Sequence, residues 1–364
     1  MKEYDVIVVG SGPAGLSCAI ETAGAGASVS IIDENKKPGG QLFKQIHKFF
    51  GSKQHSAGTR GFDIGAQLLE QTRNLGVDIF LDSVAYGIFT NKILAIEKDG
   101  NIQQIRGRKI LLATGAVENS VVFPGWTLPG VMGAGAAQTM INISRVLPGR
   151  RFVIVGSGNV GLIVSYQLLQ AGAEVLAVVE ALPHIGGYQV HASKILRAGV
   201  PILTSSTIKE ARGNMEVEEV VIANIDSEWK AIDGTEKSLT ADSICIATGL
   251  HPSTRLAQMA GCELTFSSIL GGHLPVHNEN METSFKEIYV SGDAAGVEEA
   301  SAAMEEGRLA GIDMARKLGY LTHGEADSRR EKVIQSLIAL RSGPFGFPRH
   351  KAKLEIIEKS RYSN

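Results

Sequence analysis

Residues 6–34 read VIVVGSGPAGLSCAIETAGAGASVSIIDE, and residues 152–180 read FVIVGSGNVGLIVSYQLLQAGAEVLAVVE. Each stretch predicts a buried strand, a G-x-G-x-x-G turn, an apolar helix and a second buried strand that ends in an acid. Asp33 follows Gly10 by 23 residues, and Glu180 follows Gly156 by 24. Because such a turn lets the amides of a helix N-terminus hold two phosphates, the repeat predicts two dinucleotide sites.

The two copies continue alike beyond these stretches. A Gly-Gly pair follows each acid, and an Ala-Thr-Gly closes each copy, at residues 113–115 and 247–249. Between them, residues 88–105 and 207–225 alternate apolar and polar side chains, which is typical of meander strands. The fold class predicted is therefore α/β, with two related Rossmann-like units, each a parallel sheet with a β-meander as crossover.

The composition and charge of the chain disfavour several classes of protein. The 364 residues contain 42 glycines, only three cysteines and a formal net charge of −2, so no basic field favours nucleic acid as the main partner. No apolar run approaches the roughly 20 residues of a membrane span, and no targeting segment precedes the first strand, so we expect a cytoplasmic protein. Cys18, Cys245 and Cys262 form no C-x-x-C pair, and we expect no metal site.

The glycines and acids of each motif have distinct expected roles. Gly10 allows the tight turn, Gly12 lets the pyrophosphate approach the backbone, and Gly15 lets the helix pack on the sheet. Asp33, with Glu34 beside it, has the position of the ribose acceptor. In the second copy Glu180 has that position and no arginine follows it, which favours NAD(H) over NADP(H) and leaves another adenine nucleotide open.

A third segment is expected at the first site. Residues 287–293, EIYVSGD, predict a strand that ends at Gly292 and Asp293, and a helix is predicted over residues 298–318. A carboxylate there can hold a polyol chain, and a helix N-terminus can face an electron-rich ring. The alternative is that Asp293 only caps the helix.

Together these residues resemble the flavoproteins with two dinucleotide-binding domains. The resemblance rests on VVGSGPAG, ILLATG, VIVGSGNVG, CIATG and IYVSGDAAG, in this order, and covers residues 4 to 318. It implies FAD on a first domain made of residues 1–120 and 250–325. NAD(H), or ATP or ADP instead, would bind a second domain, residues 121–249, inserted in the first. Residues 326–364 would form a C-terminal helix and basic tail.

The resemblance also carries over individual binding residues. It assigns no catalytic side chain and no metal ligand. For FAD it implies Gly10, Ser11, Gly12, Pro13, Ala14, Gly15, Asp33, Glu34, Gly40, Gln41, Leu42, Val84, Ala113, Thr114, Gly115, Gly292, Asp293 and Ala300. For the second nucleotide it implies Gly156, Gly158, Asn159, Val160, Gly161, Glu180, Thr248 and Gly249.

The segment before the second glycine motif narrows the resemblance. The thioredoxin-reductase-like branch has a redox C-x-x-C there, whereas residues 124–139 read PGWTLPGVMGAGAAQT. That segment is similar to the FAD/NAD-binding subunit of opine oxidases, dye-linked L-proline dehydrogenases, heteromeric sarcosine oxidases and hydrogen cyanide synthases. The resemblance implies an electron-transfer subunit in a hetero-oligomer. Its partners would be an amino-acid-oxidase-like flavoprotein that oxidises the C–N bond and, if a [2Fe-2S] cluster exists, a small subunit that holds it.

Two other functions stay open at this point. The intact second motif is also compatible with a stand-alone NADH-dependent flavin reductase that passes electrons to ferredoxin, a quinone or another acceptor. A weaker alternative is a scaffold whose second nucleotide is structural. The amine or amino acid oxidised is not specified by this chain.

Two segments have no counterpart in the repeat. The first copy has 23 extra residues after Gln41, in which His47, Phe49, Phe50 and His55 either cover a flavin or simply pack a loop. The tail, residues 321–364, holds nine Lys/Arg and five Asp/Glu, and GPFGFP at residues 343–348 is predicted to break its helix. This tail is either a packed terminal helix or a docking arm.

Overall fold

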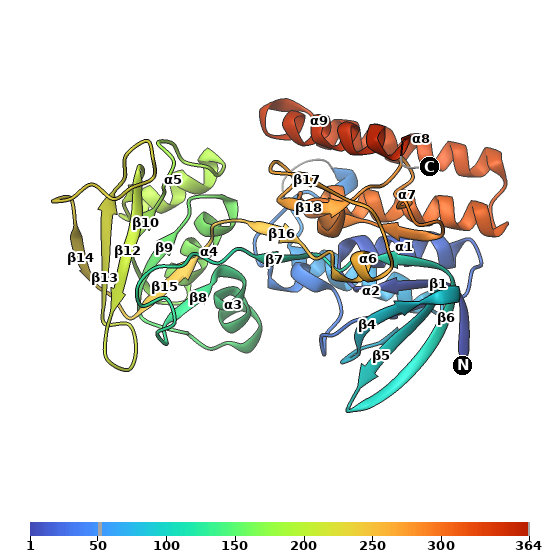
Figure 1. The fold of residues 1–364 in the computed structure, drawn as a ribbon, viewed down its shortest axis with the longest axis horizontal. Helices are drawn as coiled ribbons and strands as arrows, with labels where there is room; N and C mark the ends of the chain where they lie inside the picture. The colour runs from blue at the N-terminus through green and yellow to red at the C-terminus, as the bar shows by residue number, and fades with distance from the viewer. Residues whose placement is uncertain (50–52, 363–364) are drawn as a thin grey trace. The chain divides into compact units, whose positions relative to one another are not determined.

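The computed structural model describes residues 1–49 and 53–362. The chain forms two compact units (Figure 1). Unit 1 consists of Met1–Val117 and His251–Asn364, and unit 2 of Glu118–Leu250. The predicted α/β fold, with a parallel sheet in each glycine-motif copy, is confirmed. The C-terminal residues after 325 are part of unit 1.

The N-terminal part of unit 1 runs from the first glycine motif to a meander. Its elements are β1 (Lys2–Val9), α1 (Pro13–Gly24), β2 (Val29–Ile32), the 3₁₀ segments η1 (Gly40–Lys44) and η2 (Lys53–His55), α2 (Gly61–Asn74), β3 (Asp78–Phe80), β4 (Val84–Phe89), η3 (Thr90–Lys92), β5 (Ile93–Lys98), β6 (Asn101–Leu112) and β7 (Ala116–Glu118). Strands β4, β5 and β6 pair antiparallel, so the predicted meander is present.

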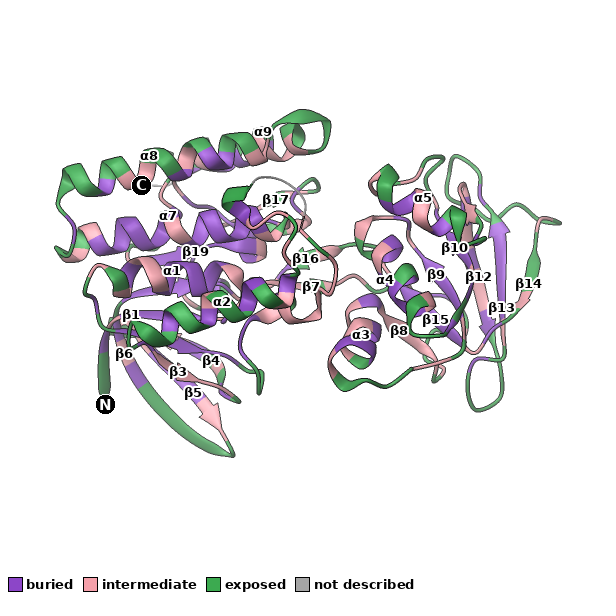
Figure 2. Cartoon of the chain, turned by 180° about the vertical axis from the view of Figure 1, so that it is seen from behind, coloured by how far each residue is buried: buried purple, intermediate pink, exposed green. Residues whose placement is uncertain are grey.

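The C-terminal part of unit 1 returns to the same sheet. It consists of β16 (Leu250–Pro252), α6 (Arg255–Met259), β17 (Leu264–Ser267), β18 (Gly272–Pro275), β19 (Ile288–Val290), η5 (Gly292–Ala295), α7 (Ala300–Leu318), α8 (His323–Leu340) and α9 (Gly343–Ser360). Figure 1 shows α8 and α9 as an outer layer over α7, which with α1 covers the sheet. Figure 2 shows α7 as largely buried between these layers.

The sheet of unit 1 has the order β3-β2-β1-β6-β5-β4, with β19 paired to the end of β6. Strand β1 lies parallel between β2 and β6, and β19 runs parallel to β6. Val8 is opposite both Ile31 and Leu111, and Val290 is opposite Leu112. The carboxyl ends of β1, β6 and β19 therefore meet at one edge, where ligands of open parallel sheets bind.

Unit 2 repeats this design in a smaller form. Its elements are β8 (Val131–Gly133), α3 (Ala134–Gln138), a π-helical segment (Thr139–Ser144), β9 (Arg151–Val155), α4 (Asn159–Gln170), β10 (Glu174–Val179), α5 (Gln189–Arg197), β11 (Ile202–Leu203), β12 (Ser206–Arg212), β13 (Glu219–Asn224), β14 (Lys237–Thr240) and β15 (Ser243–Ile246). Its parallel sheet has the order β11-β10-β9-β15-β8, and β12, β13 and β14 form a separate antiparallel sheet.

The segment GPFGFP does not interrupt the tail in the way its composition suggests. Helix α8 ends at Leu340, before this segment, and α9 already begins at Gly343. Pro344 lies in the first turn of α9, where a missing amide proton has no acceptor to lose, and Pro348 lies inside the helix. The helix of the tail is therefore broken at residues 341–342, directly before this segment, and the segment itself starts a second helix that we did not predict.

Candidate nucleotide-binding site

The first glycine turn leaves an open space in front of a helix N-terminus. A Cβ atom on Gly10, whose φ is +104°, would lie 2.2 Å from the carbonyl oxygen of Ala113, and one on Gly15 would lie 1.9 Å from that of Gly10. Beside Gly12, by contrast, no atom lies within 4 Å of such a Cβ. The turn is thus packed on the sheet side and open on the other, which fits a pyrophosphate held by the amides that begin α1.

The acid at the end of β2 is bound to this turn. Oδ2 of Asp33 accepts hydrogen bonds from the amide and the hydroxyl of Ser11, at 2.7 and 2.5 Å. Oδ1 accepts two more, from the amide and the side chain of Asn35, at 2.8 and 2.9 Å. Asp33 is buried, and four hydrogen bonds are about as many as a carboxylate accepts. Its side chain therefore holds the loop, and little acceptor capacity is left for a ribose.

Unit 2 contains the same arrangement at its own glycine turn. Oε2 of Glu180 accepts from the amide and hydroxyl of Ser157, at 2.8 and 2.6 Å, and Oε1 accepts from the amide of Leu182 at 2.9 Å. In each copy the serine hydroxyl also accepts from a Gly-Gly amide, that of Gly39 or Gly186. We call each set of serine, acid and Gly-Gly contacts an acid lock.

A β-bulge aligns the two acid locks. The register of β10 against β9 shifts between Val175 and Ala177, which absorbs the extra residue between Gly156 and Glu180. Ile32 is opposite Val9 and Val179 is opposite Val155, so Asp33 and Glu180 occupy equivalent positions. The residue that follows is the exposed Glu34 in unit 1 and Ala181 in unit 2.

The other residues expected around the first site have different surroundings in the structure. Gly40 packs so closely on the glycine turn that a Cβ would lie 2.9 Å from Cα of Gly12. Thr114 donates its hydroxyl proton to the carbonyl of Ser253 at 2.8 Å. Leu42 is fully buried against Ile64 and Met304, so its side chain belongs to the core. Gln41 and Val84 are exposed, and Ala300 is the first residue of α7.

In unit 2 the closing segment is also tied to the chain. Gly249 has a φ of +106°, and its carbonyl accepts a hydrogen bond from the amide of Asn119 at 3.0 Å. The hydroxyl of Thr248 donates to the carbonyl of Asn119 at 3.2 Å. Helix α4 begins at Asn159, directly after Gly158, whose Cα hydrogens face open space.

The Gly292–Asp293 turn lies between β19 and α7. Asp293 does not cap α7, because that helix begins at Ala300 with Glu299 as its N-cap. Its Oδ1 accepts one hydrogen bond, from the amide of Glu298 at 3.3 Å. Burial, reinforced by the negative charge of Glu306, raises the pKa of Asp293 to about 6. The carboxyl of Asp293 therefore retains acceptor capacity that Asp33 lacks.

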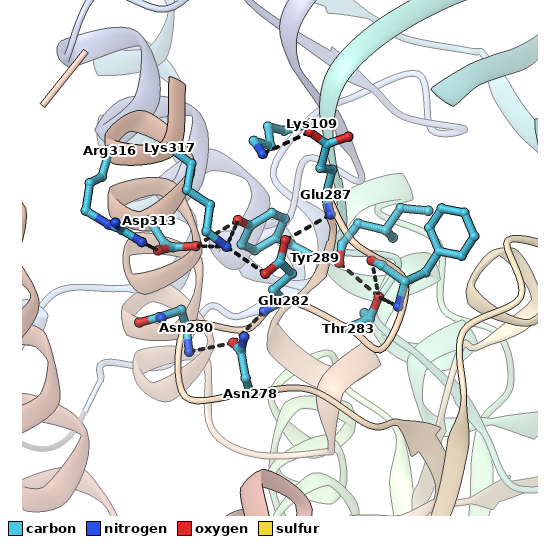
Figure 3. Close-up of polar contacts among 12 residues, drawn as sticks. Lys109, Asn278, Asn280, Glu282, Thr283, Glu287, Tyr289, Asp313, Arg316 and Lys317 are labelled. Atoms are coloured by element: carbon cyan, nitrogen blue, oxygen red, sulfur yellow. Dashed lines mark hydrogen bonds and ion pairs between the residues drawn. The ribbon is translucent and has the colours of Figure 1, made fainter. Parts of the chain in front are cut away.

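A polar network fixes the strand that leads into this turn (Figure 3). The hydroxyl of the fully buried Tyr289 donates to Oδ2 of Asp313 at 2.7 Å. Nζ of Lys317 lies 2.6 Å from Glu282 and 3.0 Å from Asp313. Burial, followed by the charge of Asp313, raises the pKa of Tyr289, so its hydroxyl stays protonated.

The insertion after Gln41 is attached to the C-terminal helices. His55 is buried, and its Nε2 lies 2.9 Å from Oε1 of Glu305 on α7 and 3.0 Å from the hydroxyl of Ser336 on α8. The ring of His47 stacks on Phe49 at 6.3 Å, and Phe50 lies outside the described residues. The His55 contacts support the packing role of this loop.

Neither the partners of His55 nor the role of the serines in the acid locks was evident from the sequence. The contact joins three segments that are far apart in the sequence, through His55, Glu305 and Ser336. No short motif could therefore predict it. All three cysteines are buried and free, and burial raises the pKa of each thiol. Across the described residues, every helix is either too short or too polar to cross a membrane.

The chain matches known oxidoreductases along most of its length. The family model described as pyridine nucleotide-disulphide oxidoreductase matches residues 4–307. The A subunit of opine oxidase from Agrobacterium tumefaciens is 31% identical, over 94% of this chain and 71% of the relative. The HcnB subunit of hydrogen cyanide synthase from Pseudomonas aeruginosa is 30% identical, over 94% and 78%. The alpha subunit of sarcosine oxidase from Rhizobium meliloti is 26% identical over 86% of this chain and 31% of its own length.

Solved structures share the fold at lower identity. L-Proline dehydrogenase from P. horikoshii superposes with a TM-score of 0.70 at 23% identity, covering 92% of this chain and 59% of the other. Thioredoxin reductase from T. acidophilum gives 0.72 at 20%, covering 87% and 99%. The family implies binding of FAD and NAD(P), and the open glycine turns fit such groups. The chain belongs to the pyridine nucleotide-disulphide oxidoreductase family and is an FAD-dependent oxidoreductase.

Proposed function

We propose that unit 1 holds FAD and that unit 2 holds a second adenine nucleotide, NAD(H) or else ATP or ADP. The observation that carries this assignment is the glycine turn present twice, packed toward the sheet and open in front of the helix. Unit 1 adds the Gly292–Asp293 turn at the same sheet edge, next to the long helix α7. Bound FAD supplies the redox chemistry.

Different residues of unit 1 would bind the different parts of FAD. The amides at the start of α1 hold the pyrophosphate, with Gly12 giving room for it. Because Asp33 is used by the acid lock, we assign the ribose hydroxyls to the exposed Glu34. The carboxylate of Asp293 accepts from the polyol chain of the cofactor. The amides near the start of α7 then favour negative charge on a ring placed before them.

In unit 2 the acid at the end of the second strand is already hydrogen-bonded to the chain, so another feature must set the cofactor preference. Three hydrogen bonds commit Glu180 to the acid lock, and Ala181 stands where unit 1 has Glu34. No arginine or lysine follows to receive a 2′-phosphate, since the next residues are Leu182 and Pro183. The preference for NAD(H) over NADP(H) then rests on this missing cation.

We further propose that the chain is the electron-transfer subunit of a cytoplasmic, multi-subunit amino acid or amine dehydrogenase of the proline, sarcosine or opine type. Three kinds of relative are named as subunits of oxidases or synthases, which supports a hetero-oligomer. The chain has no C-x-x-C, and its cysteines are buried, which disfavours internal disulfide exchange. An amino-acid-oxidase-like flavoprotein would oxidise the C–N bond, and a small [2Fe-2S] protein is a second candidate partner.

The purified chain tests this function directly. We expect it to bind FAD and to show no bleaching of the flavin absorbance with proline, sarcosine or an opine. Bleaching should appear once the co-purifying oxidase-like flavoprotein is added. Bleaching by an amine substrate in the isolated chain would contradict the proposal.

The intact acid lock of unit 2 supports a second candidate, a stand-alone NADH-dependent reductase. Stopped-flow mixing with micromolar NADH separates the two. Rapid flavin reduction in the isolated chain favours the reductase, and no reduction favours the electron-transfer role.

A further inference from the structure

The two C-terminal helices place positive charge inside unit 1, next to the Gly292–Asp293 turn. Lys353 of α9 is only 2% exposed, and its Nζ lies 2.6 Å from Oε1 of Glu306 on α7. Arg341, at the end of α8, contacts the same oxygen at 2.5 Å through Nη2. Its Nε donates to Glu298 at 2.9 Å. One buried carboxylate is thus held by two cations from two helices.

Glu306 and Lys353 also hold the backbone of the turn itself. The other oxygen of Glu306, Oε2, accepts a hydrogen bond from the amide of Gly292 at 3.0 Å. Lys353 donates to the carbonyl of Ala295 at 2.9 Å. These two hydrogen bonds fix the backbone of Gly292 and Ala295, the first and last residues of η5, and Asp293 lies between them. Its position therefore depends on the C-terminal helices as well as on β19.

Charge in this cluster is nearly balanced and is shielded from water. Burial raises the pKa of Glu306, but Lys353 and then Arg341 outweigh it, and the net pKa is lowered. His277 is buried beside them, and burial followed by the charge of Lys353 lowers its pKa to about 4, so it adds no positive charge at neutral pH. Loss of either cation would leave uncompensated negative charge that solvent screens poorly.

Apolar packing keeps α9 in this place. Ala352 and Ile356 flank Lys353 on the helix and form a buried cluster with Leu270 and Leu274 of the β17–β18 region. Of the two roles expected for the tail, this favours the packed helix. A docking arm has no need to bury a lysine against the carbonyl of Ala295.

We propose that Lys353 and Arg341 are positioning residues of the flavin site, which set the affinity for FAD and the reduction potential of the bound flavin. They act through Glu306, which fixes Gly292, and Lys353 also fixes Ala295. The inference rests on the proposed FAD site in unit 1. A missing cation shifts the turn and adds net negative charge near the site, which opposes the charge that a flavin gains on reduction.

The test compares Lys353→Met and Arg341→Met with Lys351→Met, a control on the exposed side of α9. Fluorescence titration gives the dissociation constant for FAD, and dye-coupled reduction gives the potential. For Lys353→Met we expect at least tenfold weaker FAD binding and a lower potential, with a smaller change of the same sign for Arg341→Met. The control should match the unsubstituted protein.

A compensating variant separates charge balance from general loss of structure. In the double variant Lys353→Met/Glu306→Gln both charges are gone, while the glutamine can still accept from Gly292. This variant should restore an unshifted potential and part of the FAD affinity, because the charge balance returns while the contact of Lys353 with Ala295 stays lost. If Lys353→Met does not fold, Arg341→Met and the double variant carry the test. Unchanged affinity and potential in folded single variants would overturn the inference alone. Failure of the unsubstituted protein to bind FAD would instead overturn the proposed function.

Discussion

The acid locks give a prediction in which one half of the chain serves as the control for the other. In Asp33→Asn an amide nitrogen replaces one carboxylate oxygen and faces donors, so at least two of the four hydrogen bonds to this side chain are lost. A hydrogen bond to a charged group contributes about 1.5 kcal/mol. We therefore expect the local free energy of opening around residues 10–16 to fall by about 3 kcal/mol.

Hydrogen exchange followed by mass spectrometry measures this loss locally, in FAD-free protein under conditions where exchange reports opening equilibria. A loss of about 3 kcal/mol corresponds to roughly 100-fold faster exchange. In Asp33→Asn this should appear in peptides covering residues 6–16 and not in those covering 152–162. In Glu180→Gln the pattern should be reversed, because that side chain holds Ser157.

Glu34→Gln completes the comparison. Its exchange should match the unsubstituted protein, while FAD should bind about tenfold more weakly, which is the loss of one hydrogen bond to a charged acceptor. The reasoning would be refuted if Asp33→Asn weakened FAD binding without faster exchange. That result would indicate that Asp33, and not Glu34, accepts the hydrogen bonds from the ribose hydroxyls.

Three further outcomes are expected. Because burial raises the pKa of Asp293 from 3.8 to about 6, the folded carboxyl holds its proton more tightly than the unfolded one. Its contribution to stability without FAD therefore falls as the pH rises from about 4 to 6, and Asp293→Asn should gain up to about 3 kcal/mol at pH 7 and nothing at pH 4 in urea unfolding. His55→Ala removes the hydrogen-bond partner of buried Glu305 and should lower the free energy of unfolding by about 2–4 kcal/mol in the same assay. A change close to zero would instead indicate that His55 is an exposed loop residue. In native protein, thiol reagents should not label Cys18, Cys245 or Cys262 within minutes, and fast labelling of any of them would contradict their burial.

The local parts of the fold were predictable from the sequence because each depends on residues a few positions apart. The strand, turn and helix around Gly10 and around Gly156 are where the motif indicated. The sequence already placed Asp33 and Glu180 at equivalent positions, and the structure shows how, because a bulge in β10 absorbs the extra residue between Gly156 and Glu180. The binding roles of these residues remain predictions.

Contacts between segments that are distant in the sequence could not be predicted from its pattern. Lys353 and Glu306 are 47 positions apart, and nothing in the basic composition of the tail distinguishes this lysine from its exposed neighbours. Prolines in GPFGFP suggested a break, but a proline in the first helical turn costs no hydrogen bond. Burial, which sequence pattern describes poorly for charged residues, decided the case of Lys353, whereas the position of Pro344 in the first turn of α9 decided the other.

The paired ends of unit 2 have a consequence for engineering. Asn119 and Gly249 are hydrogen-bonded near the two points where the chain enters and leaves unit 2, and the connecting strands β7 and β16 form a two-stranded sheet. Ends that already lie together add little loop-closure entropy when the segment between them is removed or replaced. Residues 118–250 are therefore a natural cassette. We expect that this segment can be expressed alone to measure nucleotide binding, exchanged for a unit of different nucleotide preference, or replaced by a short linker that closes unit 1.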